Sequence, residues 1–410
     1  MIKLLFSVVF LLSSAFSKDV PDISVSVDRF AFVFAMSCFE NSQNNELGRL
    51  ISEALSEKSD DYQNDCEQFV ICFINDRPND RRMTSTLIAA KKEALLASEK
   101  MFDSSRGVLE QRKEELSIYW NKFFKKDKIG FSKVYKFYGI SPQLFKVFLY
   151  LSGIQGTFAK GFGTNIFLRF SYGKRTTDTC AVFKEICNCL YQRMPKARAA
   201  QVEHYFVFHK SPHAMAAYLI LGETLAHAIG VRWIYQVLSS DSDSSPDPYS
   251  DPNIEKVSSE IFQTVNEYLG NKGELDDNFC ESFIRIVAEQ FPKAKDLFDI
   301  MLSKISLITE NGIDITVCSS AILSSFNVRD ITNKQSNYTT VFIGRNLGDQ
   351  ALKTISTKLP KKDNNFLFIT KNNTNKLFIV ICTNDETKIQ TAVRRVKRLK
   401  EFTEDYVVDL

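Results

Sequence analysis

The sequence predicts a mixed α/β, helix-rich protein. It has an N-terminal βαβ-like unit, a mainly helical region after it, and a small C-terminal β-α-β-β-α domain. Three observations support this prediction. Two continuous apolar runs flank an amphipathic segment near the start of the chain. The middle of the chain repeats its apolar residues at helical spacing. The last 80 residues alternate short apolar runs with amphipathic stretches.

The first 17 residues have the pattern of a secretory signal peptide. Lys3 provides the positive charge, and an apolar core of about a dozen residues follows it up to Phe16. Ala15 and Ser17 are the small residues that a signal peptidase requires before its cleavage site. The core is shorter than the roughly 20 residues of a spanning helix. The sequence therefore predicts entry into the secretory pathway, as a secreted or ER-lumenal protein, with an uncleaved membrane anchor as the alternative.

The overall composition is that of a globular protein with two or three domains. The chain has 410 residues, of which 44% are hydrophobic and 25% are charged. Its net charge of +3 predicts neither general nucleic-acid binding nor an acidic partner, and we expect no nucleic-acid partner. The 34 phenylalanines carry no polar group, and we expect most of them to lie in cores.

Nine cysteines are available for disulfide bonds in an oxidising compartment. The nearest candidates for pairing are Cys66 with Cys72, and Cys180 with Cys187 or Cys189. Because nine is an odd number, at least one thiol stays unpaired or bonds to another chain.

Two N-glycosylation sequons occur in the C-terminal part of the chain. They are Asn337-Tyr338-Thr339 and Asn372-Asn373-Thr374. Both Asn337 and Asn372 are therefore predicted glycan sites of a secreted protein.

The first predicted domain, residues 18–238, begins with two buried strands that flank a helix. Arg29–Met36 and Glu67–Ile74 are almost entirely apolar, which is typical of buried strands, and Asn45–Leu55 has helical periodicity. A strand, a helix and a second strand in this order predict a βαβ unit with parallel strands.

The rest of this domain is predicted to be mainly helical. Residues 82–126 form one helical stretch that Gly107 divides into two. Further helices are predicted over residues 141–151, 178–193, 195–208 and 212–237. Glu223, His227 and Arg232 interrupt the apolar sequence of the last of these, so it is predicted as a core helix rather than a membrane-spanning one.

Residues 239–252 are rich in Ser, Asp and Pro and predict a solvated linker. The alternative, a calcium loop, lacks the glycine and the distal glutamate of an EF-hand. A helical segment is predicted over residues 253–330 and the small α/β domain over 331–410.

Five elements are predicted in the small α/β domain. They are a strand at 340–343, a helix after Asp349, strands at 365–370 and 377–382 that form a hairpin, and a helix capped by Asp385. Their order is similar to that of the C-terminal domain of alanyl-tRNA synthetases. The glycine-rich run of that domain is absent here, and we take no function from the similarity.

Two histidines are the candidate metal ligands. His209 and His213 have a spacing that places both imidazoles on one face of a continuous helix. Glu203 and Glu223 would complete such a site. However, Ser211 and the proline after it predict that a helix begins between the two histidines. The sequence therefore favours ordinary polar histidines and no metal or other cofactor.

Cys38 and Asp76 are the candidate catalytic residues. They follow the two predicted parallel strands, and ligands of such sheets bind at the carboxyl ends of the strands. A thiol beside a carboxylate would support hydrolysis, but no histidine lies near in the sequence to act as a base. The glycines at 153, 156, 161 and 163 match no phosphate-binding motif and predict turns.

Two basic surfaces are the candidate binding regions. One is the last predicted helix, with Arg394, Arg395, Lys397, Arg398 and Lys400. In the other, lysines alternate with aromatic residues between Trp120 and Phe137. Such a pattern suits a helix with a phenylalanine core, docking to an anionic membrane surface or, less well, nucleic-acid binding.

These patterns contain no complete catalytic or metal-binding constellation. The leading functional prediction is therefore a secreted or ER-lumenal interaction protein without catalysis, which binds an unidentified protein partner. The alternatives are a secreted hydrolase or metal-dependent enzyme that gathers its residues from distant segments, and a protein that docks to membrane surfaces through the Lys/Phe-rich region.

Overall fold

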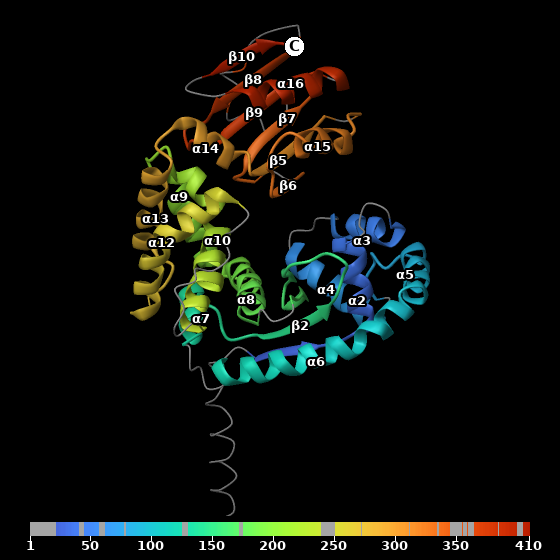
Figure 1. The fold of residues 1–410 in the computed structure, drawn as a ribbon. Helices are drawn as coiled ribbons and strands as arrows, with labels where there is room; N and C mark the ends of the chain where they lie inside the picture. The colour runs from blue at the N-terminus through green and yellow to red at the C-terminus, as the bar shows by residue number, and fades with distance from the viewer. Residues whose placement is uncertain are drawn as a thin grey trace, which may run out of the picture. The chain divides into compact units, whose positions relative to one another are not determined.

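The structure is a computed structural model that describes residues 22–410 apart from a set of short segments. These segments are 41–44, 57–61, 78, 125–129, 172–174, 239–250, 272, 311, 334–335, 345–354, 356–358, 360–364, 384 and 400–404. The predicted signal peptide, most of the predicted linker and the predicted helix after Asp349 thus lie largely outside the described residues. The predicted helix-rich α/β class is confirmed (Figure 1).

The chain forms two compact units, and neither is continuous in the sequence. Unit 1 comprises residues 1–195, 225–250 and 262–274. Unit 2 comprises residues 196–224, 251–261 and 275–410. Each unit has its own β-sheet.

The sheet of unit 1 has four strands in the order β1-β2-β4-β3. β1, β2 and β4 are parallel, and β3 pairs antiparallel with β4 through a tight turn in which Gly163 has a φ of 59°. The prediction of a helix over residues 141–151 is wrong, because strand β2 occupies most of that range. Its apolar residues are buried because helices pack against it, and periodicity does not distinguish a short buried strand from a buried helix. The strands are β1 (Asp22–Ser26), β2 (Leu144–Tyr150), β3 (Phe158–Phe162) and β4 (Asn165–Arg169).

The two predicted strands of the βαβ unit are helices, so the βαβ prediction is wrong. The first is α2 (Arg29–Ala35), which continues into the π-helical turn η1 (Met36–Glu40), and the second is α4 (Tyr62–Ile74). Asp28 caps α2 by accepting a hydrogen bond of 2.9 Å from the Ala31 amide. Five consecutive residues of α2 are buried, and a helix enclosed on every side has no amphipathic period. The predicted helix between them is confirmed as α3 (Glu46–Ser56).

The predicted helical stretch 82–126 is confirmed, but its division lies elsewhere. α5 (Ser85–Ala97) and α6 (Glu99–Phe124) meet at Ser98, and α6 runs without interruption through Gly107. α6 lies along β1 and β2 (Figure 1). Its buried residues Leu109, Leu116 and Trp120 recur at helical spacing on one face.

A close helix crossing joins α8 to the long apolar stretch of the chain. α8 (Arg175–Gln192) packs against η2 (Ala228–Trp233), where Gly230 faces the α8 backbone. A Cβ atom at Gly230 would lie 2.5 Å from both Cα and N of Lys184. The two backbones thus approach more closely than any larger residue permits. α7 (Ser132–Tyr138) also packs on α8.

The predicted apolar helix 212–237 is confirmed as a continuous helical stretch, Ala214–Leu238. It consists of α10 (Ala214–His227), η2 and α11 (Ile234–Leu238). It is long and apolar enough to cross a membrane, but 89% of its most apolar window is buried inside the protein. This burial agrees with the expectation of a core helix.

Four helices of unit 2 confirm the helical prediction for residues 195–208 and much of that for 253–330. They are α9 (Lys196–Phe208), the first part of α12 (Pro252–Gly270), α13 (Asp277–Gln290) and α14 (Ala294–Met301). On α9 and α13, Tyr205 donates a hydrogen bond of 2.6 Å to Glu281 and Gln201 donates one of 3.1 Å to Asp277.

The sheet of unit 2 has six strands in the order β10-β8-β9-β7-β5-β6. The predicted strands at 340–343, 365–370 and 377–382 are confirmed, and the last two form the predicted antiparallel hairpin. The sheet also contains β5, β6 and β10, which sequence reasoning missed. β5 lies in the segment 253–330 that was predicted as helical, and β6 begins at its last residue. The strands are β5 (Lys304–Thr309), β6 (Asp330–Thr332), β7 (Thr339–Ile343), β8 (Phe366–Lys371), β9 (Leu377–Cys382) and β10 (Tyr406–Asp409).

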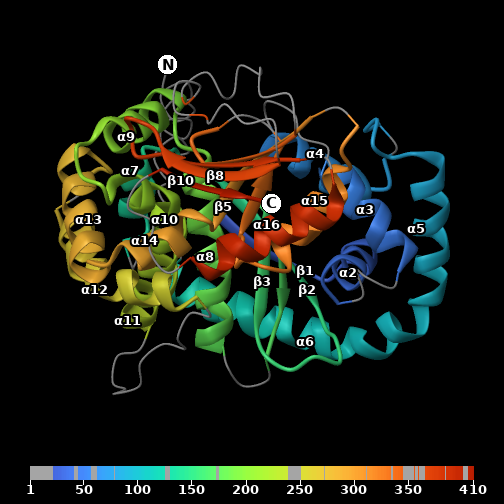
Figure 2. The ribbon, with the colours of Figure 1, turned by 90° about the horizontal axis from the view of Figure 1, so that it is seen from above.

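The central strands of this sheet are apolar on both faces. One face carries a cluster that includes Phe342, Phe366 and Phe378. On the other face, Ile379 and Ile381 of β9 lie with buried residues of α15 (Ile315–Leu323) and α16 (Glu386–Arg398). These two helices are side by side in both views (Figures 1 and 2). Because alternate residues of a strand point to opposite faces, both sets must be apolar.

We expect Gly230→Ala to lower the free energy of unfolding by about 1–3 kcal/mol, because the added methyl group overlaps the α8 backbone. Gly107→Ala is the matched control. A Cβ there meets nothing within 4 Å, and alanine favours the helix by about 0.5–1 kcal/mol. Urea unfolding followed by circular dichroism measures both effects. Wild-type stability of Gly230→Ala would contradict the close crossing.

Candidate functional site

The candidate site is a groove between α15 and α16 on the surface of unit 2. Each helix is fixed by an aspartate cap and by buried residues. Asp314 caps α15 by accepting a hydrogen bond of 2.7 Å from the Thr316 amide, and Cys318 and Ile322 anchor it on the sheet. The predicted cap of α16 is confirmed, because Asp385 accepts a hydrogen bond of 2.8 Å from the Thr387 amide.

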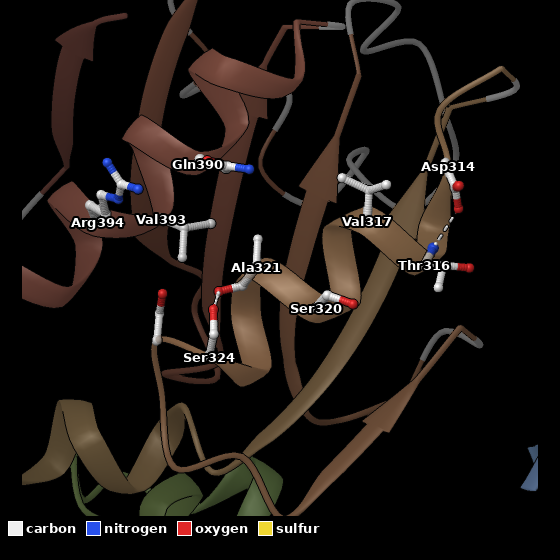
Figure 3. Close-up of a pocket in the computed structure, with 10 residues that line it drawn as sticks. Asp314, Thr316, Val317, Ser320, Ala321, Ser324, Gln390, Val393 and Arg394 are labelled. Carbon is white, nitrogen blue, oxygen red and sulfur yellow. Dashed lines mark hydrogen bonds between the residues drawn. The ribbon is translucent and has the colours of Figure 1, made fainter. Parts of the chain in front are cut away.

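The groove has a volume of about 520 Å³ and is shown in Figure 3. This volume lies in the range of small-molecule sites, about 300–1,000 Å³. Most of the lining side chains are small or carry a hydroxyl group. The lining residues are Asp314, Thr316, Val317, Ser320, Ala321, Ser324, Ser325, Gln390, Val393 and Arg394.

The groove exists because the facing side chains of α15 are short. Ser320, Ala321 and Ser324 recur on one face of that helix, and they leave space beside α16 (Figure 3). Val393 of α16 is buried and forms part of the apolar lining, whereas Gln390 is exposed. A bound chain would therefore meet a wall of hydroxyl groups and a small apolar patch.

Opposite charges lie toward the two ends of the groove. Asp314 lies toward one end and Arg394 toward the other (Figure 3). The Thr316 amide and hydroxyl hold the pKa of Asp314 below its usual value, so its carboxylate stays ionised at neutral pH. Arg394 is exposed and makes no ion pair with another described residue.

The predicted basic residues of the last helix separate into two groups. Lys397 and Arg398 are exposed and follow Arg394 by three and four residues, so they lie on its side of α16. Arg395 instead donates a hydrogen bond of 2.6 Å to the Asp409 carbonyl oxygen of β10. Lys400 lies outside the described residues. The free positive charge of this helix is thus concentrated near the Arg394 end of the groove.

The side chains that line the groove suit ligand binding rather than catalysis. Its hydroxyl groups have no histidine, lysine or glutamate beside them among the lining residues to act as a base. The one lining carboxylate, Asp314, is engaged as a helix cap. Hydrogen bonds from hydroxyl and amide groups, together with the Arg394 charge, suit recognition of a polar chain.

The structure does not support Cys38 and Asp76 as a catalytic pair. Their proposed proximity came from two parallel strands, and both segments are helices. Asp76 instead accepts a bond of 2.8 Å from the buried Lys91 ammonium. Desolvation raises the pKa of the Cys38 thiol, so its nucleophilic thiolate form is disfavoured.

The structure places the two candidate metal ligands against different partners. His209 Nε2 lies 2.9 Å from Glu281 Oε2, and its Nδ1 accepts a bond of 3.1 Å from the Ser211 amide. His213 Nε2 lies 3.2 Å from the Phe291 carbonyl oxygen, and burial lowers its pKa. The predicted interruption between them is confirmed, since α9 ends at Phe208 and α10 begins at Ala214.

The other candidate ligands do not complete a site with these histidines. Glu203 accepts hydrogen bonds from Tyr218 and Asn337. Among the described residues, no group of three or more His, Cys, Asp or Glu side chains is arranged to hold a metal ion.

A buried glutamate on α8 was missed from the sequence. Glu185 Oε2 accepts a hydrogen bond of 3.0 Å from the Gly161 amide of β3, and Oε1 accepts one of 3.3 Å from Asn188. A glutamate on a helix can serve as the general base of a zinc protease. The helix of such an enzyme has the pattern H-E-x-x-H, with histidine ligands one residue before and three residues after the glutamate. Those positions hold Lys184 and Asn188, which are not a zinc ligand set. Glu185 therefore ties α8 to the sheet edge.

The aromatic residues of the Lys/Phe-rich region fill a core. Trp120 is buried and donates a hydrogen bond of 2.9 Å to Thr179. Phe124 stacks on Phe183 with ring centroids 4.4 Å apart. Phe131, Tyr135 and Phe137 are buried as well, whereas Lys122 and Lys136 are exposed. Of the possibilities that the sequence left open, this arrangement fits a helix with a phenylalanine core. Lys125, Lys126 and Lys128 lie outside the described residues.

The cysteines of the predicted local disulfides are too far apart to pair in the structure. Cys66 and Cys72 lie in α4, and the three other candidate cysteines lie in α8. Six or more residues of helix separate their Cα atoms by about 9 Å or more, and a disulfide requires less than about 7 Å. No two of the nine cysteines are at disulfide distance. A disulfide to another chain stays a prediction.

The chain matches no protein-family model, no curated protein and no solved structure.

We expect Cys38 to be alkylated by iodoacetamide at pH 8 at least about tenfold more slowly in the native protein than in the unfolded chain. The reason is that its thiol is desolvated, and the reagent attacks the thiolate. Peptide mapping by mass spectrometry measures the modification, with the urea-unfolded protein as the control. Rapid native alkylation at Cys38 would restore it as a candidate nucleophile.

Proposed function

We propose that this chain is an interaction protein of the secretory pathway that binds an acidic polypeptide segment in the groove between α15 and α16. The observation that carries the proposal is the groove itself. It combines a volume of about 520 Å³ with hydroxyl groups and one exposed arginine.

The shape of the groove favours a polypeptide ligand. The short side chains of Ser320, Ala321 and Ser324 allow a bound backbone to approach α15 closely. Hydroxyl groups and the Gln390 amide offer donors and acceptors for peptide groups along the groove. The apolar contact to Val393 would exclude water from part of the interface.

The charge near the groove favours an acidic sequence. Arg394, Lys397 and Arg398 lie within one turn of α16, and all three are exposed. A guanidinium group can bind a carboxylate through two parallel hydrogen bonds. Such charges increase the association rate and select against basic partners. The negative charge of Asp314 lies toward the opposite end, so the acidic part of the ligand is expected at the Arg394 end.

The proposed compartment rests on the N-terminal sequence. The positive residue, the apolar core and the small residues before Lys18 support entry into the secretory pathway.

The binding proposal is tested with a fluorescein-labelled peptide of alternating Glu and Ser and the full-length mature chain. We expect Arg394→Glu to weaken binding of this peptide by at least about tenfold, because reversal of one contacting charge costs about 1.4 kcal/mol or more. Fluorescence polarisation at low and at physiological ionic strength measures the affinity, which should fall as salt increases.

Arg285→Glu is the matched control, because Arg285 is exposed on α13, outside the groove, and the change in net charge is the same. It should alter the affinity by less than about twofold. Ser320→Phe, which fills the groove, should weaken binding as Arg394→Glu does. Equal losses for both arginine variants, or wild-type binding by Ser320→Phe, would contradict the proposal.

A further inference from the structure

The two glycosylation sequons of this chain differ sharply in their surroundings in unit 2. Asn372 lies where β8 leads into the turn of the β8–β9 hairpin, and Asn337 lies just before β7. The sugar acceptor in such sequons is the side-chain nitrogen Nδ2. The hydrogen bonds and the exposure around each Nδ2 therefore decide which site can carry a glycan in the folded protein.

The side-chain oxygen of Asn372 accepts hydrogen bonds from residues of the same turn. Asn372 Oδ1 accepts hydrogen bonds from the Thr374 amide at 3.1 Å, the Thr374 hydroxyl at 2.9 Å and the Lys376 amide at 3.0 Å. This is an Asx-turn, which is formed by residues close in the sequence. Among the described residues, Nδ2 has no hydrogen-bond partner.

The turn around Asn372 is local and lies at the surface. The Asn372 amide donates to the Lys376 carbonyl oxygen at 3.1 Å, and the Asn375 amide donates to the Asn372 carbonyl oxygen at 3.0 Å. Asn375 has a φ of 57°, in the left-handed region that asparagine tolerates in turns. Asn373, the middle residue of the sequon, is exposed. A sugar on Asn372 can leave this turn toward solvent.

At Asn337 the side-chain nitrogen is occupied. Asn337 Nδ2 donates a hydrogen bond of 2.7 Å to Glu203 Oε1, which also accepts one of 3.2 Å from the Tyr218 hydroxyl. The sequon hydroxyl is buried as well: Thr339 is 1% exposed and donates at 2.6 Å to the Met301 carbonyl oxygen. A glycan on Asn337 would compete with this half-buried contact to Glu203.

We propose that Asn372 is N-glycosylated and that Asn337 stays unmodified. The Asn372 nitrogen forms a bond to the anomeric carbon of a lipid-linked oligosaccharide donor. The bond from that carbon to the pyrophosphate oxygen breaks, the lipid pyrophosphate leaves, and the Nδ2 proton passes to a base of the transferase. The Thr374 hydroxyl, by donating to Oδ1, polarises the amide for this transfer. The inference rests on the secretory address proposed above and is independent of the groove.

The test is expression of the full chain in cultured animal cells, followed by peptide-N-glycosidase treatment and peptide mapping. The glycosidase converts each glycosylated Asn to Asp. We expect conversion at Asn372 and none at Asn337 in the wild-type protein. Asn372→Gln should remove the glycan completely, whereas Thr374→Ser, which keeps the hydroxyl and the sequon, should retain it. Asn337→Gln should leave the glycan mass unchanged.

Conversion at Asn337, or no glycan on secreted protein, would overturn the proposal. In a second expression, a proven secretory leader replaces residues 1–17. This experiment tests glycosylation at Asn372 independently of whether residues 1–17 direct the chain into the secretory pathway. A glycan at Asn372 only with the proven leader would refute residues 1–17 as a secretory signal and support Asn372 as a glycosylation site. No glycan at Asn372 with either leader, when the protein is in the lumen or the medium, would refute the site.

Discussion

Burial of both faces of the six-stranded sheet is the constraint on which unit 2 depends. Strands β7 and β9 are fully buried, so each must present apolar side chains in both directions. A phenylalanine cluster occupies one face, and α15 and α16 occupy the other. Because both helices are held by buried residues on the same face, their exposed sides meet, and the short side chains of α15 leave the groove open.

This constraint also explains why the groove suits binding rather than catalysis. The side chains that hold α15 and α16 are apolar, whereas those that line the groove are chiefly hydroxyl groups, small apolar groups and one arginine. The polar clusters elsewhere have structural partners. Lys91 binds Asp76, Glu185 binds the edge of the unit 1 sheet, and His209 binds Glu281. Each of these contacts joins two elements within one unit.

Amphipathic helices were predictable from the sequence, and fully buried segments were not. The helices α3, α6 and α16 repeat apolar residues at helical spacing, and each was predicted as a helix, although the predicted break at Gly107 falls inside α6. The segments Arg29–Met36, Glu67–Ile74 and 141–151 each contain a short, mostly buried apolar run. Periodicity does not separate a helix from a strand in so short a run, and the choice then depends on which partners surround it.

The candidate site was predictable only in part, because the residues that form it lie far apart in the sequence. By itself, the sequence determined the secretory signal pattern, the cap at Asp385, the basic face of the last helix and the two sequons. Only the tertiary structure brought Ser320 and Arg394, which are 74 residues apart in the chain, into the lining of one groove. It also occupied the Asn337 amide with Glu203. Local periodicity determines which face of a helix is apolar. The neighbour of that face is decided by long-range packing, which no local pattern encodes.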